Sequence, residues 1–288
     1  MTSGDLPKVV IFADPSKGDV KTAVEQFADY CRGKVQTIAT CGIDQCTADV
    51  LQDADYAVVF GGDGSIIAAA RQLSDSNVPV IGVNLGKLGF LAEFSLAELQ
   101  QYLPTIAAGR AVIEERMMLK CSVVRGRQQQ FSSAAINDVF ITAGPPFRMI
   151  ELQICVAGQA PVSCVSDGLI VCTPTGSTAY NLSAGGPIVS GNLEAMVITA
   201  ICPHSLSFRP IVIDAARRVE VRGVRLNEGT TVSVDGQHCC GLSTGQTVHI
   251  ERHAGKFLVV NNPLRTQWDT LATKLGWAQK PKYNRDRA

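Results

Sequence analysis

The stretch "DYAVVFGGDGSIIAAARQL", residues 55–73, decides the fold. Its first six residues form an apolar run that predicts a buried strand, and a helix is expected from about Ser65 to Leu73. Between them lies a loop of three glycines around one charged residue, Asp63. In an α/β fold, a loop that joins a buried strand to a helix lies at the carboxyl edge of a parallel sheet, where such folds bind ligands.

The segments around this stretch extend the same pattern. Strands are predicted at 8–14, 35–40 and 78–84 and a helix at 19–32, and this alternation indicates a parallel sheet with right-handed crossovers. After about residue 115 the chain changes to short strands separated by turn residues, which predicts a β-rich, sandwich-like domain.

The sequence therefore predicts an α/β domain over residues 1–115 and a β-rich domain over 116–264. In the last part, 265–288, apolar residues at helical spacing predict a helix that returns to the first domain, followed by a polar tail. The residues of that helix expected to cover apolar surface are Trp268, Leu271 and Leu275.

Composition narrows the class of protein. The chain has 288 residues, of which 46% are hydrophobic and 18% charged, so it can bury a sizeable core. Its 26 basic and 26 acidic residues cancel, which argues against a protein that coats nucleic acid or an anionic membrane. The first residues match neither a signal peptide nor a transmembrane helix, so a cytoplasmic protein is expected.

Ten cysteines are scattered along the chain without a C-x-x-C pair. Most lie in apolar runs, where a free cysteine behaves as a small hydrophobic residue, so buried, reduced thiols are expected. The adjacent Cys239 and Cys240 are the pair in which oxidation would be looked for.

The glycine loop has two interpretations. It can be a tight turn that carries one solvated aspartate, since glycine readily adopts positive φ. Alternatively, its backbone N–H groups, contributed by Gly61, Gly62 and Gly64 beside a helix N-terminus, can bind phosphate. An aspartate within such a loop repels phosphate unless it has a task, such as binding Mg²⁺ or accepting the proton of a hydroxyl that is being phosphorylated.

Three further stretches carry candidate site residues. "NLGKLGFLAEF" (84–94) is either an ordinary connection or a wall for a planar ring, through Phe90 and Leu91. "SDGLIVCTPTGSTAYNLSAGGPIV" (166–189) is either a strand-to-helix connection with an N-cap at Ser177 or Thr178, or a helix start that lines a ligand. "IND" (136–138) is either a turn or an amide and a carboxylate at a strand edge.

Together these motifs, in this order, resemble the NAD kinase family over about residues 8 to 277. The glycine tetrad alone is shared with diacylglycerol and sphingosine kinases, whereas "TPTGSTAYNLSAGGP" is far more specific. The resemblance implies an α/β domain joined to a β-sandwich, in homodimers or homotetramers. It also implies phosphorylation of the adenosine 2′-hydroxyl of NAD by ATP with Mg²⁺, giving NADP.

The resemblance also assigns roles to individual residues of this chain. Asp63 is implied as general base, Gly64 as part of the same loop, and Asn137 and Asp138 as ligands of the ribose hydroxyls. The other positions implied to contact NAD or ATP are Phe90, Arg148, Val165, Asp167, Thr178, Ala179, Tyr180, Asn181, Leu182, Ser183 and Gln237. No fixed protein ligand for the metal is predicted. From the residues themselves, Lys87 is either a cation for the γ-phosphate or a surface side chain.

Two rival functions come from other classes. A lipid kinase would share the glycine tetrad, but the polar block at 173–183 disfavours a cleft for acyl chains. A non-catalytic dinucleotide sensor would bind NAD or NADP without turnover, and the presence of Asp63 disfavours that.

Overall fold

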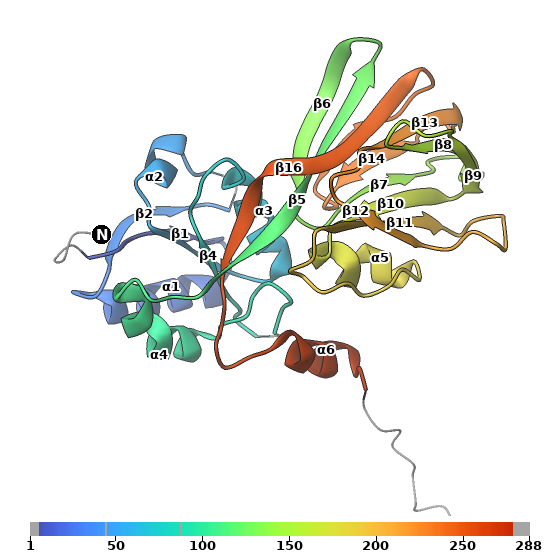
Figure 1. The fold of residues 1–288 in the computed structure, drawn as a ribbon. Helices are drawn as coiled ribbons and strands as arrows, with labels where there is room; N and C mark the ends of the chain where they lie inside the picture. Colours follow the sequence, from blue (N-terminus) through green and yellow to red (C-terminus); the bar gives the residue numbers. More distant parts are fainter. Residues whose placement is uncertain (1–5, 44, 87, 279–288) are drawn as a thin grey trace, which may run out of the picture. The chain divides into compact units, whose positions relative to one another are not determined.

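The computed structural model describes residues 6–43, 45–86 and 88–278, which form two compact units (Figure 1). Unit 1 takes the chain up to Ile66, the segment Val78–Ile113 and the chain from Val259 onward. Unit 2 takes Ile67–Asn77 and Glu114–Leu258. The chain thus leaves unit 1 and returns to it at the end.

Unit 1 contains a parallel sheet in the order β2-β1-β3-β4. The strands are β1 (Lys8–Phe12), β2 (Gln36–Cys41), β3 (Tyr56–Phe60) and β4 (Val80–Val83). β1, β3 and β4 are almost entirely buried, as expected for strands covered on both faces. The last strand of the chain, β16 (Gln246–Val260), adds Val259 beside Val80 in parallel orientation. The predicted parallel sheet is confirmed.

The helices of unit 1 each bury at least one apolar side chain. They are α1 (Gly18–Cys31), α2 (Ala48–Gln52), α4 (Leu96–Ala107), α6 (Gln267–Leu275) and the start of α3 (Asp63–Gln72). Phe27 of α1 meets Phe60 of β3 edge to face, with ring centroids 5.5 Å apart. Leu99 and Leu103 of α4 belong to the same buried cluster. The sequence analysis named neither α2, which is only one turn long, nor α4.

Unit 2 contains two largely antiparallel sheets. One has the order β12-β11-β10-β7-β14-β15, and the other joins β16, β13, β8 and β9 with the hairpin of β5 and β6. The strands are β5 (Ile113–Arg125), β6 (Gln128–Ala135), β7 (Asp138–Thr142), β8 (Ile150–Val156), β9 (Val162–Ser166), β10 (Gly168–Cys172), β11 (Ala195–Ile201), β12 (Ile211–Asp214), β13 (Val219–Arg225), β14 (Thr231–Val234) and β15 (His238–Gly241). Side chains from both sheets, such as Leu152 and Leu169, share one core, which confirms the predicted sandwich.

Two long runs of strand-forming residues are each broken in the structure. The run 130–143 divides into β6 and β7 at Ile136–Asn137, and the run 160–174 divides into β9 and β10 at Asp167. Both interruptions carry residues that the sequence placed in the site.

The helix α6 belongs to unit 1, as predicted, but it buries less than expected. Only Leu271 of its three predicted contact residues is buried, at 3% exposure, whereas Trp268 is 63% and Leu275 40% exposed. The ring of Trp268 instead lies 5.4 Å from that of Trp277. A capping box between Thr266 and Asp269 starts the helix. The predicted polar tail lies outside the described residues.

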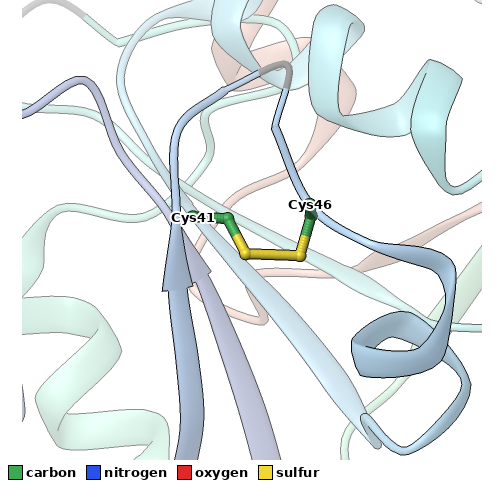
Figure 2. Close-up of a disulfide and its surroundings, with 2 residues drawn as sticks. All are labelled: Cys41 and Cys46. Carbon is green, nitrogen blue, oxygen red and sulfur yellow. A yellow bond between two sulfur atoms is a disulfide. The ribbon is translucent and has the colours of Figure 1, made fainter.

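Eight of the ten cysteines are free thiols, in line with the expectation for most of them, although only four of the eight are buried. A disulfide joins Cys41, at the end of β2, to Cys46 in the segment that leads to α2 (Figure 2). The four buried thiols are those of Cys31, Cys121, Cys164 and Cys172. Cys239 and Cys240 lie next to each other in β15, and adjacent strand residues point to opposite faces. They remain separate thiols.

Candidate active site

Asp63 begins α3, two residues before the predicted helix start, so its carboxylate lies in the first helical turn. Its side chain is 29% exposed. The preceding turn requires Gly61, whose φ is +153° and whose added Cβ would lie 2.5 Å from the Ser65 Oγ. Directly after strand β3, the chain therefore turns sharply and presents the carboxylate at the carboxyl end of the sheet.

The carboxylate of Asp63 accepts three backbone hydrogen bonds from the segment after β4. Its Oδ2 accepts the N–H of Phe90 at 2.9 Å. Its Oδ1 accepts those of Leu91 at 2.9 Å and Ala92 at 3.1 Å. A carboxylate has about four lone-pair sites, so these bonds fix its orientation and leave one site, on Oδ2.

The segment 84–94 is shaped to donate these bonds. The Asn84 side-chain amide donates to the carbonyl oxygens of Ala92 at 3.2 Å and Phe94 at 3.0 Å. A Cβ at Gly89 would lie 2.0 Å from the Asp63 Oδ1, so only glycine allows the turn to approach so closely. The motif thus holds the carboxylate, and Phe90 is half-buried beside it. Lys87 lies outside the described residues.

A lysine that the sequence analysis did not single out accompanies this carboxylate. The Lys274 Nζ, in the last turn of α6, lies 3.7 Å from the Asp63 Oδ2. The same ammonium lies 4.8 Å from the ring centroid of Phe90. Unit 1 therefore places a cation, a carboxylate and an aromatic ring together.

One of the three loop amides expected to bind phosphate, that of Gly61, is already bonded within the protein. The N–H of Gly61 donates to the carbonyl of Val83 at 2.9 Å and is part of the sheet edge. At the start of α3 the N–H groups of Ser65 and Ile66 donate to the carbonyl oxygen of Gly62, at 3.0 and 3.3 Å. The positive end of the helix dipole at this position favours an anion.

In unit 2, Asp235 holds the "IND" segment by its backbone. Its carboxylate accepts the N–H groups of Ile136 at 3.0 Å, Asn137 at 2.8 Å and Asp138 at 3.1 Å. The Asp235 side chain is 0% exposed, and the guanidinium of Arg71 lies 3.6 Å from its Oδ2. The sequence analysis missed Asp235, although "VDG" at the end of an apolar run marks a turn.

Arg71 also reaches one predicted contact residue. Its guanidinium donates to the Gln237 Oε1 at 2.8 Å. Gln237 thus lies in one network with Asp235, close to the "IND" segment.

Asp138 is a buried carboxyl, 3% exposed. Burial, as the larger cause, and the nearby charge of Asp235 together raise its pKa to about 7. Near neutral pH this carboxyl can therefore hold a proton and donate a hydrogen bond.

The 3₁₀ turn η1 (Thr175–Thr178) begins against Asn137. The Thr173 hydroxyl donates to the carbonyl of Ile136 at 2.7 Å and accepts the N–H of Gly176 at 3.0 Å. A Cβ at Gly176 would lie 2.0 Å from the carbonyl oxygen of Asn137. The "IND" and "TPTGSTAY" motifs are therefore neighbours in space.

Within α5 (Tyr180–Ser183), Asn181 has a different task from the one expected. Its side chain is 0% exposed and donates to the carbonyl oxygens of Ser177 at 3.0 Å and Pro187 at 3.1 Å. It also accepts the Thr199 hydroxyl at 2.7 Å. Because protein groups occupy both ends of the amide, Asn181 holds the turn together instead of presenting its amide to a ligand.

Its neighbours are more open. Tyr180 is 37% exposed and its ring meets that of Phe140 edge to face at 5.1 Å. Thr178, Ala179 and Leu182 are half-buried, and Ser183 is exposed.

Three predicted contact residues lie elsewhere in unit 2. β7 and β10 are antiparallel, with Asp138 opposite Cys172 and Thr142 opposite Gly168. Asp167 therefore lies at the end of β10 opposite to the "IND" segment, about 17 Å away at the usual strand rise. Arg148 and Val165 belong to the chain around that far end, so the structure does not bring these three to the Asn137 group within one chain.

Comparison with known proteins identifies the chain. Residues 10–111 match the model of the ATP-NAD kinase N-terminal domain, and 136–262 match that of the ATP-NAD kinase C-terminal domain. The chain is 42% identical over 275 residues to the NAD kinase of Desulforamulus reducens, covering 92% of this chain and 96% of that protein. It is 38% identical over 283 residues to the NAD kinase of Geobacter metallireducens, covering 96% of this chain and 100% of that one.

The chain belongs to the ATP-NAD kinase family.

Solved structures agree with this family. An NAD kinase from Archaeoglobus fulgidus in complex with ATP gives a TM-score of 0.72 at 25% identity, covering 90% of this chain and 94% of that one. Yeast NADH kinase complexed with NADH shares the fold, with a TM-score of 0.85 at 24% identity over 97% of this chain and 90% of that one. As a member of the ATP-NAD kinase family the protein is an enzyme.

Among residues 6–43, 45–86 and 88–278, His, Cys, Asp and Glu form no group of three or more that could hold a metal ion. In the same part of the chain, every helix is too short or too polar to cross a membrane.

Proposed function

We propose that the protein phosphorylates the 2′-hydroxyl of the adenosine ribose of NAD with ATP and Mg²⁺, giving NADP and ADP, and that Asp63 is the general base. The observation that carries the proposal is the Asp63 carboxylate, which three backbone N–H groups orient while one Oδ2 site is left. A carboxylate held in this way can accept the proton of a hydroxyl placed beside it.

The chemistry needs such a group because a ribose hydroxyl is a poor nucleophile. As the bond forms from its oxygen to the γ-phosphorus, the bond to the ADP oxygen breaks and the hydroxyl proton passes to the Asp63 Oδ2. A positioned base contributes roughly 10²–10⁴ in rate. Alignment of the two substrates and neutralisation of the triphosphate charge supply the rest.

Mg²⁺ would enter on the nucleotide. Because the described residues lack a cluster of three or more acidic, His or Cys side chains, most ligands of the ion would be phosphate oxygens and water, which is its usual habit. When bound, the ion neutralises charge on the phosphates.

Recognition of NAD is assigned to the Asn137 group of unit 2. The Asn137 amide and the Asp138 carboxyl offer a donor and an acceptor to the ribose hydroxyls, and Asp235 fixes the backbone that carries them. The half-exposed ring of Tyr180 offers a face to a base or a nicotinamide. Thr178, Ala179, Leu182, Ser183 and Gln237 are retained as contacts. Arg148, Val165 and Asp167 would contact ligand only from a second copy of the chain, in the expected homodimer or homotetramer.

One assay tests the proposed reaction: purified protein with ATP, Mg²⁺ and NAD, in which NADP is measured by an NADP-specific dehydrogenase. NADP formation that requires all three components supports the proposal. Binding of NAD without any formation of NADP would reject it. The cytoplasmic location stays a prediction.

A further inference from the structure

The pairing of Lys274 with Asp63 poses an electrostatic question. In the proposed reaction the triphosphate of ATP must approach the Asp63 carboxylate, which is itself an anion. Two negative charges in contact repel each other strongly in a partly buried environment. The sequence offered no cation for this task except Lys87. The structure supplies one from α6, 211 residues after Asp63 in the sequence.

Two contacts in unit 1 describe the position of the Lys274 ammonium. Its Nζ lies 3.7 Å from the Asp63 Oδ2, which is the oxygen with the remaining lone-pair site. The distance is longer than that of a hydrogen bond, so the ammonium compensates the charge without closing that site. The Phe90 ring, 4.8 Å from Nζ, holds the ammonium from a second side by a cation–π contact.

Helix α6, which carries Lys274, has a buried anchor residue and two well-defined ends. Leu271, one turn before Lys274, is 3% exposed, and a capping box and Gly276, with φ of 65°, define the two ends of α6. The side chain of Lys274 is itself 29% exposed, so an incoming anion can reach its remaining N–H donors.

We propose that Lys274 is a positioning residue of the phosphoryl-transfer site: its ammonium offsets the charge of Asp63 and thereby admits the triphosphate of the donor nucleotide. The inference rests on the proposed function, since it assigns ATP to the Asp63 side. It gives α6 a part in the site through this one side chain.

The decisive experiment is a double-mutant cycle on ATP binding. Calorimetric titration with ATP, without NAD, is carried out on the full chain, on Lys274→Met, on Asp63→Asn and on the variant with both changes. Lys274→Met should weaken ATP binding by about tenfold or more, because the carboxylate then repels the triphosphate uncompensated. In the Asp63→Asn background the same change should cost much less.

Two further variants separate charge from structure. Lys274→Arg keeps the charge and should restore most of the ATP affinity. Lys34→Met is the matched control, since the Lys34 Nζ also lies over a ring in unit 1, 3.3 Å from the centroid of Tyr30, and it should leave ATP affinity unchanged. In turnover, Lys274→Met should raise KM for ATP far more than KM for NAD.

Three results of these measurements would overturn the proposed role of Lys274. Equal losses from Lys274→Met with and without Asp63 would overturn the proposal, as would unchanged ATP affinity in a variant with a native melting temperature. A loss that Lys274→Arg does not restore, with both variants melting early, would show a merely structural contact and also overturn it. Failure of the proposed function is a separate result, in which the unchanged chain makes no NADP.

Discussion

The carboxylate of Asp235 accepts a hydrogen bond of 2.8 Å from the backbone N–H of Asn137, across 98 positions of sequence. Two more N–H groups, of Ile136 and Asp138, donate to the same carboxylate. The "IND" segment therefore owes its path to a side chain in the turn between β14 and β15, and the candidate NAD site depends on a residue that need not touch NAD.

We expect Asp235→Ala to destabilise unit 2 and abolish NAD binding. It leaves buried N–H groups without an acceptor, each worth about 1–3 kcal/mol, and Arg71 without its carboxylate. Urea denaturation should show a loss of at least about 3 kcal/mol in unfolding free energy. Asp235→Asn is the matched control, because asparagine tolerates the observed φ of 53° and keeps one acceptor oxygen. An Ala variant as stable as the Asn variant would contradict this role.

Asp63→Asn should keep the fold and NAD affinity but lower kcat by at least about a hundredfold, as expected on loss of a general base. The amide retains an oxygen for the N–H groups of Leu91 and Ala92 but cannot take up the proton. Steady-state NADP formation, with the melting temperature as a check of folding, tests this. Near-normal kcat in a well-folded variant would reject Asp63 as the base.

Asn137→Ala should weaken NAD binding by about 1–3 kcal/mol, the cost of leaving a buried polar partner unsatisfied. The backbone of residue 137 stays in place because Asp235 and Thr173 hold it by main-chain atoms. Calorimetric titration with NAD measures the change in binding free energy. Ser183→Ala, at the exposed last position of α5, gives for comparison the change caused by losing a contact at the periphery of the candidate site. Unchanged affinity on Asn137→Ala would return "IND" to a purely structural turn.

Asp138 should make stability depend on pH. Its pKa is raised to about 7 in the folded protein against 3.8 as the ordinary value, so the folded state holds a proton that the unfolded chain has lost. This contribution is fully present below the ordinary value and disappears as pH rises through about 7. Between about pH 5 and pH 8, the unfolding free energy of the unchanged protein should fall by on the order of 2 kcal/mol relative to Asp138→Asn.

The comparison is made by urea denaturation at each pH. Glu25→Gln, at an exposed position of α1, serves as the control and should run parallel to the unchanged protein. If Asp138→Asn also runs parallel to it, the carboxyl is ionised throughout and its burial is offset by other groups.

The sequence was sufficient where a local pattern sets the structure. The apolar run at 55–60 and the glycines after it predicted β3, the sharp turn at Gly61 and the exposed end of the sheet. The sequence pattern did not predict where α3 begins. Local helix propensity favours a start at Ser65, whereas in the structure Asp63 already lies in the first turn, where its carboxylate accepts the N–H groups of Phe90, Leu91 and Ala92.

The residues that the sequence missed act over long separations. Asp235 looks like an ordinary turn residue until β14 is paired with β7, and Lys274 looks like one of many surface lysines until α6 lies beside Phe90. Asn181 shows the reverse case. Its place among hydroxyl residues indicated a ligand contact, but in the structure its side-chain amide bonds to Pro187 and Thr199 of the protein itself.

The distribution of thiols decides how this enzyme can be labelled. The Cys41–Cys46 disulfide removes two of the ten sulfurs from alkylation, and burial raises the pKa of Cys31 to about 11 and that of Cys121 to about 12, so their thiolates are scarce. The exposed thiols, Cys202 and Cys239, both belong to unit 2. A maleimide dye added to the native, oxidised protein will therefore report on the β-sandwich, and a fluorescence probe of the Asp63 loop needs an introduced cysteine.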